Sequence, residues 1–190
     1  FMMALAGQAA VAIENARLLK SNKELFLNVV MSLVKLIDQR NAHYNNHSLR
    51  VAKYAVAICR QLGFPPEVLE KMQISAFLHD VGRTQIPDGI ILKPGQLSPQ
   101  EYEVVKKQPL VGAKFLQGIA MLEYAVPIVL YHMEHHNGKG YPKGLAGEQI
   151  PILARVLSVA NVFDALTSPR PHRAAVDPQS AKNRINTLSN

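Results

Sequence analysis

The chain is poor in cysteine, in long apolar runs and in concentrated charge, and each shortage excludes a class of protein. Cys59 is the only cysteine among 190 residues, which excludes an internal disulfide and fits a reducing cytoplasm. No apolar run reaches the roughly 18–20 uncharged residues that a membrane span needs. No signal peptide is recognisable, and Phe1 stands in the middle of a helical pattern, so we expect the chain to be part of a longer protein.

The formal net charge of +7 raises the question of nucleic acid, but the basic residues are spread evenly. Residues 1–95 carry 11 basic and 7 acidic side chains, and residues 96–190 carry 10 and 7. Because there is neither a basic arm nor a basic patch interleaved with aromatic residues, we expect no nucleic-acid polymer as a partner. A generally basic surface instead suits a phosphorylated small ligand.

Apolar residues make up 48% of the chain, enough for a sizeable core, and no segment alternates like a β-strand. We therefore predict an all-α fold. Along the first 37 residues, apolar or small side chains recur at steps of three or four, at Leu5, Ala9, Ala12, Ala16, Leu19, Phe26, Val30, Leu33 and Ile37. Such a heptad-like stripe serves either to pair helices or to pack a helix on its own domain, and both interpretations stay open.

Helix start and stop signals divide the rest of the chain. Gly63 ends a helix that begins near His47, and Ser98 with Glu101 forms a capping box that starts another. The first of these helices is expected to turn the following residues inward: Val51, Tyr54 or Ala55, Ile58 and Leu62. Further helices are expected at about 66–80, 123–136 and 152–167, with loops at 81–97 and 137–150.

Polar residues on separate predicted helices share one chemistry. His47 lies near the start of a helix, His79 and Asp80 close another, His132 lies in a third, and Asn161 interrupts an apolar fourth. Imidazoles and a carboxylate brought together from different helices are typical of a divalent-metal site in a helical bundle.

From about residue 24 to 180 the chain resembles the HD-GYP family, a subset of the HD phosphohydrolases. The matching stretches, in the family order, are HSLRVA (47–52), FLHDVGRTQIPDGIILKPG (77–95), LSPQEYEVVKKQPLVGAKFL (97–116), HMEHHNGKGYPKGLAGEQIP (132–151) and ARVLSVANVFDALTSPRPHR (154–173). The resemblance implies a bacterial, cytoplasmic helical bundle around two or three iron- or manganese-type ions. It also implies hydrolysis of cyclic di-GMP to the linear dinucleotide and GMP by metal-activated water.

The first segment, FMMALAGQAAVAIENARLL, resembles the closing helix of a GAF sensor domain. We accordingly divide the chain into residues 1–23, the end of a GAF-like domain acting as a signalling helix, and residues 24–190, the HD-GYP domain. This implies an upstream GAF-like sensor in the same polypeptide.

Carried over residue by residue, the resemblance makes His47, His79, Asp80 and His132 metal ligands. Asp80 is also placed among the catalytic residues, together with Arg83. Arg83 replaces a family lysine, keeps its positive charge and cannot donate a proton at neutral pH.

Three further ligand positions depart from the family pattern. Gln108 and Met133 stand where the family has histidines, and Asn161 stands where it has an aspartate. Asp80 is then the only ligand with a negative charge, and one carboxylate does not balance several divalent ions at close range. We expect at most one iron- or manganese-type ion, with the Asn161 carbonyl as a weak ligand.

Other residues near these motifs have more than one interpretation. His135 follows His132 by three residues and, with His136, either replaces the lost ligand or is an exposed residue at a helix end. The resemblance assigns Tyr141, Arg170 and Arg173 to nucleotide binding, and the two arginines are also explained as solvated residues of a proline-rich turn.

Three hypotheses follow. The leading one is a degenerate HD-GYP output domain that binds cyclic di-GMP or a partner such as a diguanylate cyclase domain, and that dimerises through its N-terminal helix. The second is an active phosphodiesterase with an altered metal site. The third is a structural dimerisation module that binds neither metal nor nucleotide.

Overall fold

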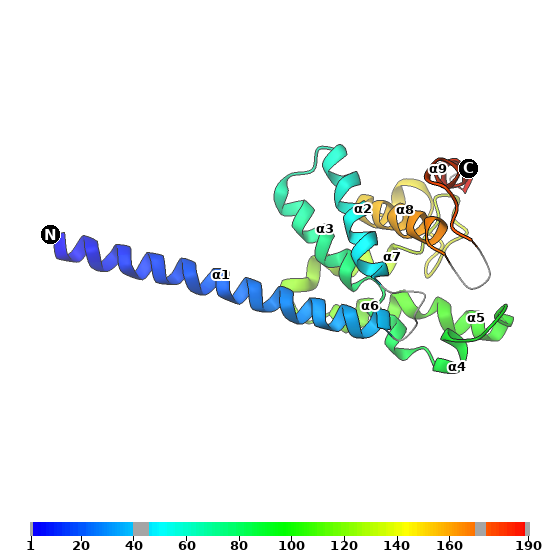
Figure 1. Cartoon of the computed structure of the whole chain (residues 1–190), viewed down its shortest axis with the longest axis horizontal. Helices are drawn as coiled ribbons and strands as arrows, with labels where there is room; N and C mark the ends of the chain where they lie inside the picture. Colours follow the sequence, from blue (N-terminus) through cyan, green and yellow to red (C-terminus); the bar gives the residue numbers. More distant parts are fainter. Residues whose placement is uncertain (1, 40–45, 170–173, 189–190) are drawn as a thin grey trace. The chain divides into compact units, whose positions relative to one another are not determined.

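The computed structural model describes residues 2–39, 46–169 and 174–188. Its elements, in chain order, are α1 Met2–Gln39, α2 His47–Gln61, α3 Pro66–Leu78, the 3-10 helix η2 Val81–Gln85, α4 Asp88–Ile91, α5 Pro99–Lys106, α6 Gln108–Leu116, η3 Ala120–Ala125, α7 Val126–Tyr131, η4 Gly147–Gln149, α8 Ile152–Thr167 and α9 Pro178–Leu188. Within these ranges no strand forms, and the nearest approach to one is an isolated bridge between Asn137 and Ala146. The predicted all-α fold is confirmed (Figure 1).

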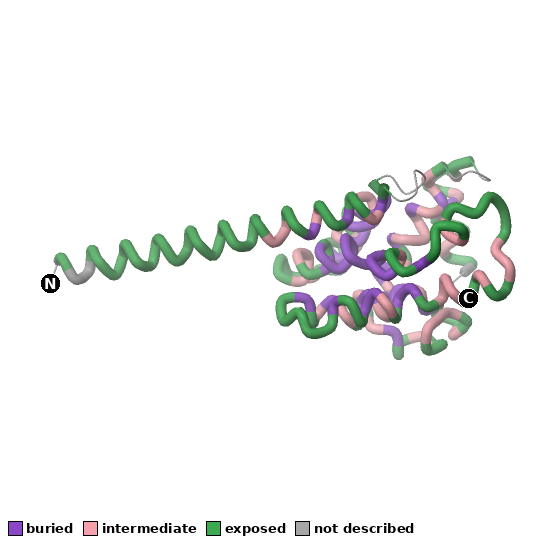
Figure 2. The backbone as a smooth tube through the Cα atoms, turned by 90° about the horizontal axis from the view of Figure 1, so that it is seen from below, coloured by how far each residue is buried: buried purple, intermediate pink, exposed green. Residues whose placement is uncertain are grey.

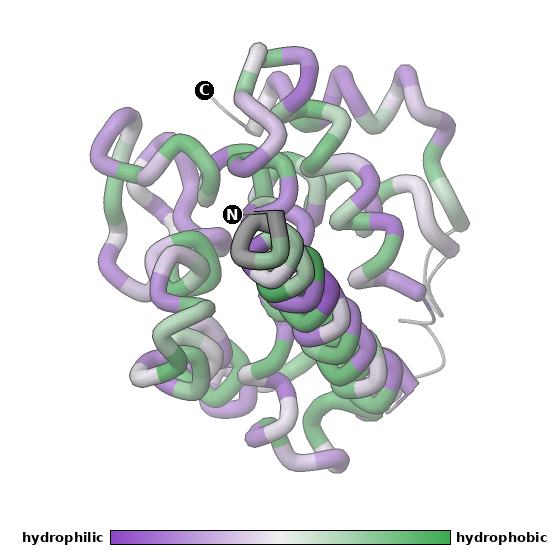
Figure 3. Tube along the Cα trace, turned by 90° about the vertical axis from the view of Figure 1, so that its left-hand side faces the viewer, coloured by the Kyte–Doolittle hydropathy of each residue, from purple (hydrophilic) through white to green (hydrophobic). Residues whose placement is uncertain are grey.

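The chain divides into two compact units, residues 1–33 and 34–190. The first unit consists of most of α1, and every side chain from residue 6 to 25 is exposed, as the green tube in Figure 2 shows. Apolar and polar residues alternate along this helix in Figure 3, and Leu19 is 71% exposed. The unit therefore presents apolar surface that it does not bury itself.

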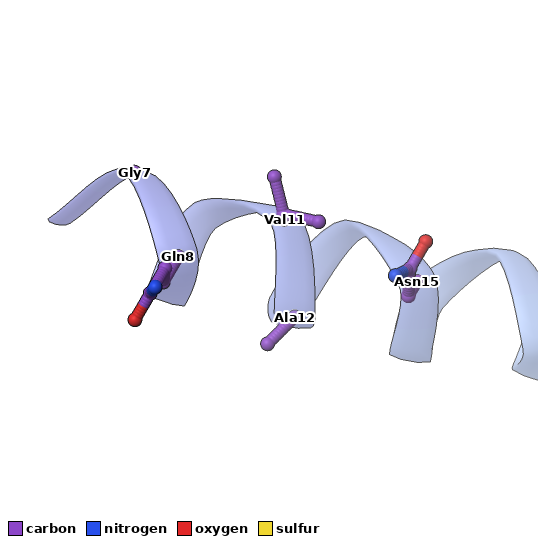
Figure 4. Close-up of a pocket in the computed structure, with 5 residues that line it drawn as sticks. All are labelled: Gly7, Gln8, Val11, Ala12 and Asn15. Carbon is purple, nitrogen blue, oxygen red and sulfur yellow. The ribbon is translucent and has the colours of Figure 1, made fainter. Parts of the chain in front are cut away.

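A shallow hollow also lies on α1, near its N-terminal end. Figure 4 shows that Gly7, Gln8, Val11, Ala12 and Asn15, which line it, all belong to consecutive turns of the same helix. The hollow is thus a surface depression between side chains of one helix and not an enclosed cavity. No described helix is both long and apolar enough to cross a membrane.

The second unit is built around α2 and α8. Helix α2 packs against α3 and α8, α6 packs against η2 and α7, and α9 packs against α8. In α2 the fully buried stripe is Val51, Ala55 and Cys59, at steps of four residues. Leu62 is 57% exposed instead of inward, because α2 ends at Gln61 and Gly63 takes a left-handed φ of 78° as expected at a helix end.

Two predicted segments differ from the structure. The stretch 81–97 was expected to be loop throughout, but η2 and α4 form within it. The helix expected over 123–136 is a 3-10 helix followed by α7, which starts at Val126, has a proline as its second residue and ends at Tyr131. In the turn that follows α7, the carbonyl of Met133 accepts a hydrogen bond from the Tyr141 N–H of the next loop (3.1 Å).

Candidate metal centre

Side chains from the start of α2 and the end of α3 meet in the interior of the second unit. One nitrogen each of His47 and His79 and one carboxylate oxygen of Asp80 lie within 4.8 Å of one another, and all three residues are buried. His132, at the C-terminal end of α7, stands beside them, with its ring centroid 5.2 Å from that of His79. The structure thus brings together four residues that the sequence placed on three separate helices.

Each histidine in this cluster is oriented by its second ring nitrogen. Nδ1 of His79 donates to the carbonyl of Ala76, and Nδ1 of His132 donates to that of Val129, both at 2.7 Å. Nδ1 of His47 lies 2.7 Å from Oδ2 of Asp164 on α8. Because Nδ1 carries the proton in these bonds, Nε2 is left with its lone pair directed toward the cluster.

The Nε2 atoms of His79 and His132 are buried and make no hydrogen bond. Nε2 of His79 lies 3.3 Å from Oδ2 of Asp80 without forming a hydrogen bond. Burying a polar nitrogen that makes no hydrogen bond is costly, and such an atom in a native fold calls for a ligand. Imidazoles whose other nitrogen is held by a carbonyl or carboxylate, next to a carboxylate such as Asp80, form the usual donor set for a divalent cation. His47, His79 and Asp80 therefore fit one such ion, and His132 lies next to them with a buried Nε2 that makes no hydrogen bond.

Asp80 is held in place by two further groups. Nε of Arg83 lies 3.0 Å from Oδ1, and the Gln108 amide donates to the same oxygen at 3.1 Å and to the His79 carbonyl at 2.9 Å. Burial by itself would raise the pKa of the Asp80 carboxyl, but the Arg83 guanidinium and the neighbouring imidazoles hold that pKa well below its usual range. Asp80 is thus a fixed negative charge, and Gln108 acts here as a hydrogen-bond donor.

Sequence reasoning missed Asp164 and Arg50. The Asp164 carboxylate contacts His47 and also accepts from Nε of Arg50 at 2.6 Å. Burial lowers the pKa of His47, but the carboxylates of Asp164 and Asp80 outweigh this and raise it above its usual value. The available signal was an acidic residue one helical turn after Asn161 in an otherwise apolar helix.

A third buried carboxylate, Asp38 at the end of α1, was also missed. It accepts from the Ser48 backbone N–H at 3.1 Å and from the Ser48 hydroxyl at 2.8 Å. Burial raises the pKa of Asp38 despite these bonds. The contact satisfies one of the N–H groups at the start of α2 that have no partner within the helix, next to His47.

The remaining two predicted ligand positions contact each other. The Asn161 amide nitrogen lies 3.7 Å from the sulfur of Met133, the distance of a weak hydrogen bond. Asn161 is in α8 and Met133 is in the turn after α7, and both side chains are half-buried. The amide and the thioether therefore satisfy one another and add no charge to the region.

The other singled-out residues do not belong to the cluster or lie outside the described ranges. His135 and His136 are exposed and follow the end of α7, so the expected shared helical face with His132 does not exist. Tyr141 is half-buried, and its ring meets that of Tyr102 edge-on, 6.5 Å between centroids. Burial raises the pKa of the Tyr141 hydroxyl, which keeps it a donor. The predicted phosphate contacts Arg170 and Arg173 lie outside the described residues.

Comparison with known proteins agrees with this geometry. The family described as HD domain matches residues 31–189, most of the chain. This chain belongs to the HD domain family. The HD domain is 36% identical over 172 residues to the cyclic di-GMP phosphodiesterase response regulator RpfG of Xanthomonas campestris, covering 88% of this chain and 46% of that protein. It is 34% identical over 169 residues to a cyclic di-GMP phosphodiesterase of Thermotoga maritima, an alignment that covers 87% of this chain and 46% of that protein.

Among solved structures, the HD domain is similar to Bd1817, described as a HDG"Y"P protein from Bdellovibrio bacteriovorus. The TM-score is 0.60 at 24% identity, over 87% of this chain and 60% of that one, which shows a common fold. The chain spans less than half the length of the two curated relatives.

Proposed function

We propose that this HD domain is a signalling module that binds cyclic di-GMP beside a single divalent metal ion and hydrolyses it slowly or not at all. The contact between Asn161 and Met133 carries the proposal. In the resembled family these two positions hold an aspartate and a histidine that ligate the metal ions. In this chain they hold a neutral amide and a thioether that contact each other.

Charge balance leads to the same number of ions. Two unit charges 4 Å apart interact with about 4 kcal/mol at an effective dielectric constant of 20, and two doubly charged ions with about four times that energy. Asp80 is the carboxylate whose oxygen lies close enough to the nitrogens of His47 and His79 to share an ion with them, whereas Asp164 contacts His47 through the opposite ring nitrogen. One negative charge supports one iron- or manganese-type ion and not a pair.

The residues of the cluster have definite tasks in this proposal. When bound, a divalent ion supplies a Lewis acid and lowers the pKa of coordinated water. His47, His79, Asp80 and His132 would hold it, and Gln108 keeps the Asp80 carboxylate in position. Arg83 offers a guanidinium to a phosphate but retains its proton at neutral pH, so it assists binding better than proton transfer.

Support for a nucleotide comes from the loop that carries Gly140, Tyr141 and Pro142, and from the relatives named as cyclic di-GMP phosphodiesterases. Tyr141 presents a protonated hydroxyl and an aromatic ring next to the exposed ring of Tyr102. Arg170 and Arg173 are proposed as phosphate contacts by resemblance alone.

A one-metal phosphodiesterase is the second candidate, and the intact orientation of the three imidazoles favours it. The two functions are separated by metal analysis of protein purified without chelators, combined with a cyclic di-GMP hydrolysis assay. We expect at most one ion per chain and little or no linear dinucleotide or GMP. One ion per chain with rapid product formation would favour the one-metal phosphodiesterase, and two or more ions together with product would overturn the proposal.

Restoring the family ligands gives a matched test. The triple variant Gln108→His, Met133→His and Asn161→Asp should gain a second ion and hydrolytic activity over the parent chain. The same triple variant with Asp80→Asn is the control and should gain neither. If the parent chain is already as active as the triple variant, it is the enzyme and not the receptor.

We further propose that α1 pairs with α1 of a second copy and transmits a signal from an upstream GAF-like sensor in the bacterial cytoplasm, with a diguanylate cyclase domain as a downstream partner. The exposed stripe on α1 supports the pairing: Leu19 lies in the predicted heptad, whereas the neighbouring Leu18 does not. Leu19→Glu should convert a dimer to a monomer in analytical ultracentrifugation, and Leu18→Glu should leave the dimer intact. A parent chain that sediments as a monomer would contradict the pairing.

A further inference from the structure

A cavity of about 200 Å³ lies between α8, α9 and the loop that follows α7. None of its lining residues belongs to the group of His47, His79, Asp80 and His132, which we call the metal-binding cluster. It is lined by the side of α8 that carries Ser158, Val159 and Val162, and by Ile185 of α9. Ligand pockets for drug-sized molecules measure about 300–1,000 Å³. This cavity therefore suits a molecule smaller than those, and a cyclic dinucleotide does not fit it.

The wall of the cavity carries one guanidinium, that of Arg155, and one carboxylate, that of Glu134. Nε of Arg155 is buried and makes no hydrogen bond, and no carboxylate of the described residues forms an ion pair with the Arg155 guanidinium. Glu134 is the acidic residue in the same wall, but its two oxygens accept the backbone N–H groups of Lys143 (2.7 Å) and Leu145 (3.1 Å). A buried guanidinium nitrogen without a partner indicates an anionic ligand.

The rest of the wall is largely apolar. Ile150, Val159, Val162 and Ile185 contribute aliphatic side chains, and the imidazoles of His135 and His136 also line the cavity. The two histidines do not make it a metal site, since the metal-capable group within the described residues is His47, His79 and Asp80. An inorganic anion would leave the aliphatic wall without contact, so the ligand needs an apolar body as well as a charge.

We propose that this cavity binds a small organic anion, a monocarboxylate with a compact apolar body of about the size of benzoate. Its carboxylate pairs with Arg155, and its body packs against Val159, Val162 and Ile185. The site shares no residue with the metal-binding cluster and does not rest on the proposed cyclic di-GMP function. In this proposal His135 and His136 line the anion-binding cavity and are not metal ligands.

Binding of sodium benzoate to the full chain, measured by titration calorimetry at constant ionic strength, tests the proposal. Benzamide, which has nearly the same shape and no charge, is the matched ligand control. Arg155→Gln should weaken benzoate binding by about 10- to 100-fold, the loss expected for a charge-assisted hydrogen bond. Arg60→Gln, at an exposed arginine of α2, should leave it unchanged.

A second variant guards against misfolding of Arg155→Gln. Val159 lines the cavity and is 39% exposed, so Val159→Phe adds a larger side chain to the cavity wall with little effect on the buried core and should abolish benzoate binding. The proposal is overturned if benzoate does not bind the parent chain saturably, if benzamide binds equally well, or if Val159→Phe binds benzoate unchanged. If the parent chain does not bind cyclic di-GMP in a parallel titration, the proposed function is contradicted, but the benzoate result still stands.

Discussion

At the scale of single residues, the metal-binding cluster depends on what holds the far side of each imidazole. His79 and His132 donate to carbonyls three residues earlier in their own helices. His47 instead depends on Asp164, which is 117 residues away in the sequence. The geometry of two ligands is thus local, whereas that of the third is set by the packing of α2 on α8.

Asp164→Asn should weaken the binding of Mn²⁺ by about 10- to 100-fold, because the amide no longer fixes the orientation and basicity of His47. The dissociation constant is measured by competition with a chromophoric chelator. Asp88→Asn, on the exposed start of α4, is the matched control and should have the parent affinity. Equal affinity of the Asp164 variant would mean that His47 is oriented without its carboxylate.

At the scale of secondary structure, the N-terminus of α5 is a local unit that the sequence alone specifies. The Ser98 hydroxyl accepts from the Glu101 backbone N–H at 3.2 Å, and the Glu101 carboxylate accepts from the Ser98 N–H at 2.6 Å and from Lys93. This confirms the predicted capping box. Ser98→Ala should lower the free energy of unfolding by about 1 kcal/mol in urea titrations, and a change near zero would show that α5 does not need its cap.

The capping box also has a defined pH dependence. Lys93 and the Ser98 backbone N–H lower the pKa of Glu101 below its ordinary value of 4.5. The stability that this carboxylate contributes is therefore fully present above pH 4.5 and is lost as the pH falls through the lower folded-state pKa. Glu101→Gln should unfold at lower urea concentration than the parent chain at neutral pH, and the difference should shrink below pH 4.5. A difference independent of pH would assign the effect to packing.

The contact between η2 and α6 leaves no room for a side chain at Gly82. A Cβ there would lie 2.0 Å from the Gln108 carbonyl oxygen and 2.8 Å from the Gly112 nitrogen. Gly82→Ala should cost about 1–3 kcal/mol or more by forcing the two elements apart. Gly89, a helical glycine with nothing within 4 Å of its added Cβ, is the control, and Gly89→Ala should stabilise slightly.

Because the Gln108 carbonyl is the first atom displaced by such a Cβ, the Gly82 variant should also disturb the amide that positions Asp80. The measurement is Mn²⁺ affinity at a temperature where the variant remains folded. Unchanged affinity together with reduced stability would separate the packing of α6 from the metal-binding cluster.

At the scale of the whole molecule, the division at residue 33 separates an exposed helix from the unit that holds the metal-binding cluster. Residues 6–25 bury no side chain within the chain, so their removal should leave the Mn²⁺ affinity of the remainder unchanged. The same truncation should abolish dimerisation in analytical ultracentrifugation. A truncated chain that fails to bind Mn²⁺ would show that α1 supports the cluster.

The sequence by itself determined the all-α fold, the start of α5, the end of α2 and the identity of the cluster His47, His79, Asp80 and His132. These features depend on helical periodicity, on contacts within a few residues and on short motifs, which are present in the linear chain. The order of the family motifs along the chain also identified Gln108, Met133 and Asn161 as positions that depart from the family pattern.

Only the tertiary structure decided what those residues do. The pairing of Asn161 with Met133, the support of Asp80 by Gln108 and the support of His47 by Asp164 join segments 28, 28 and 117 residues apart. The same holds for His135 and His136, which a continued α7 would have placed near His132. A hydrogen bond from the Tyr141 N–H to the Met133 carbonyl accompanies the turn after α7 and leaves both histidines beside a different cavity. Such contacts depend on how helices pack, and helix packing is set by the whole set of buried side chains and not by any local pattern.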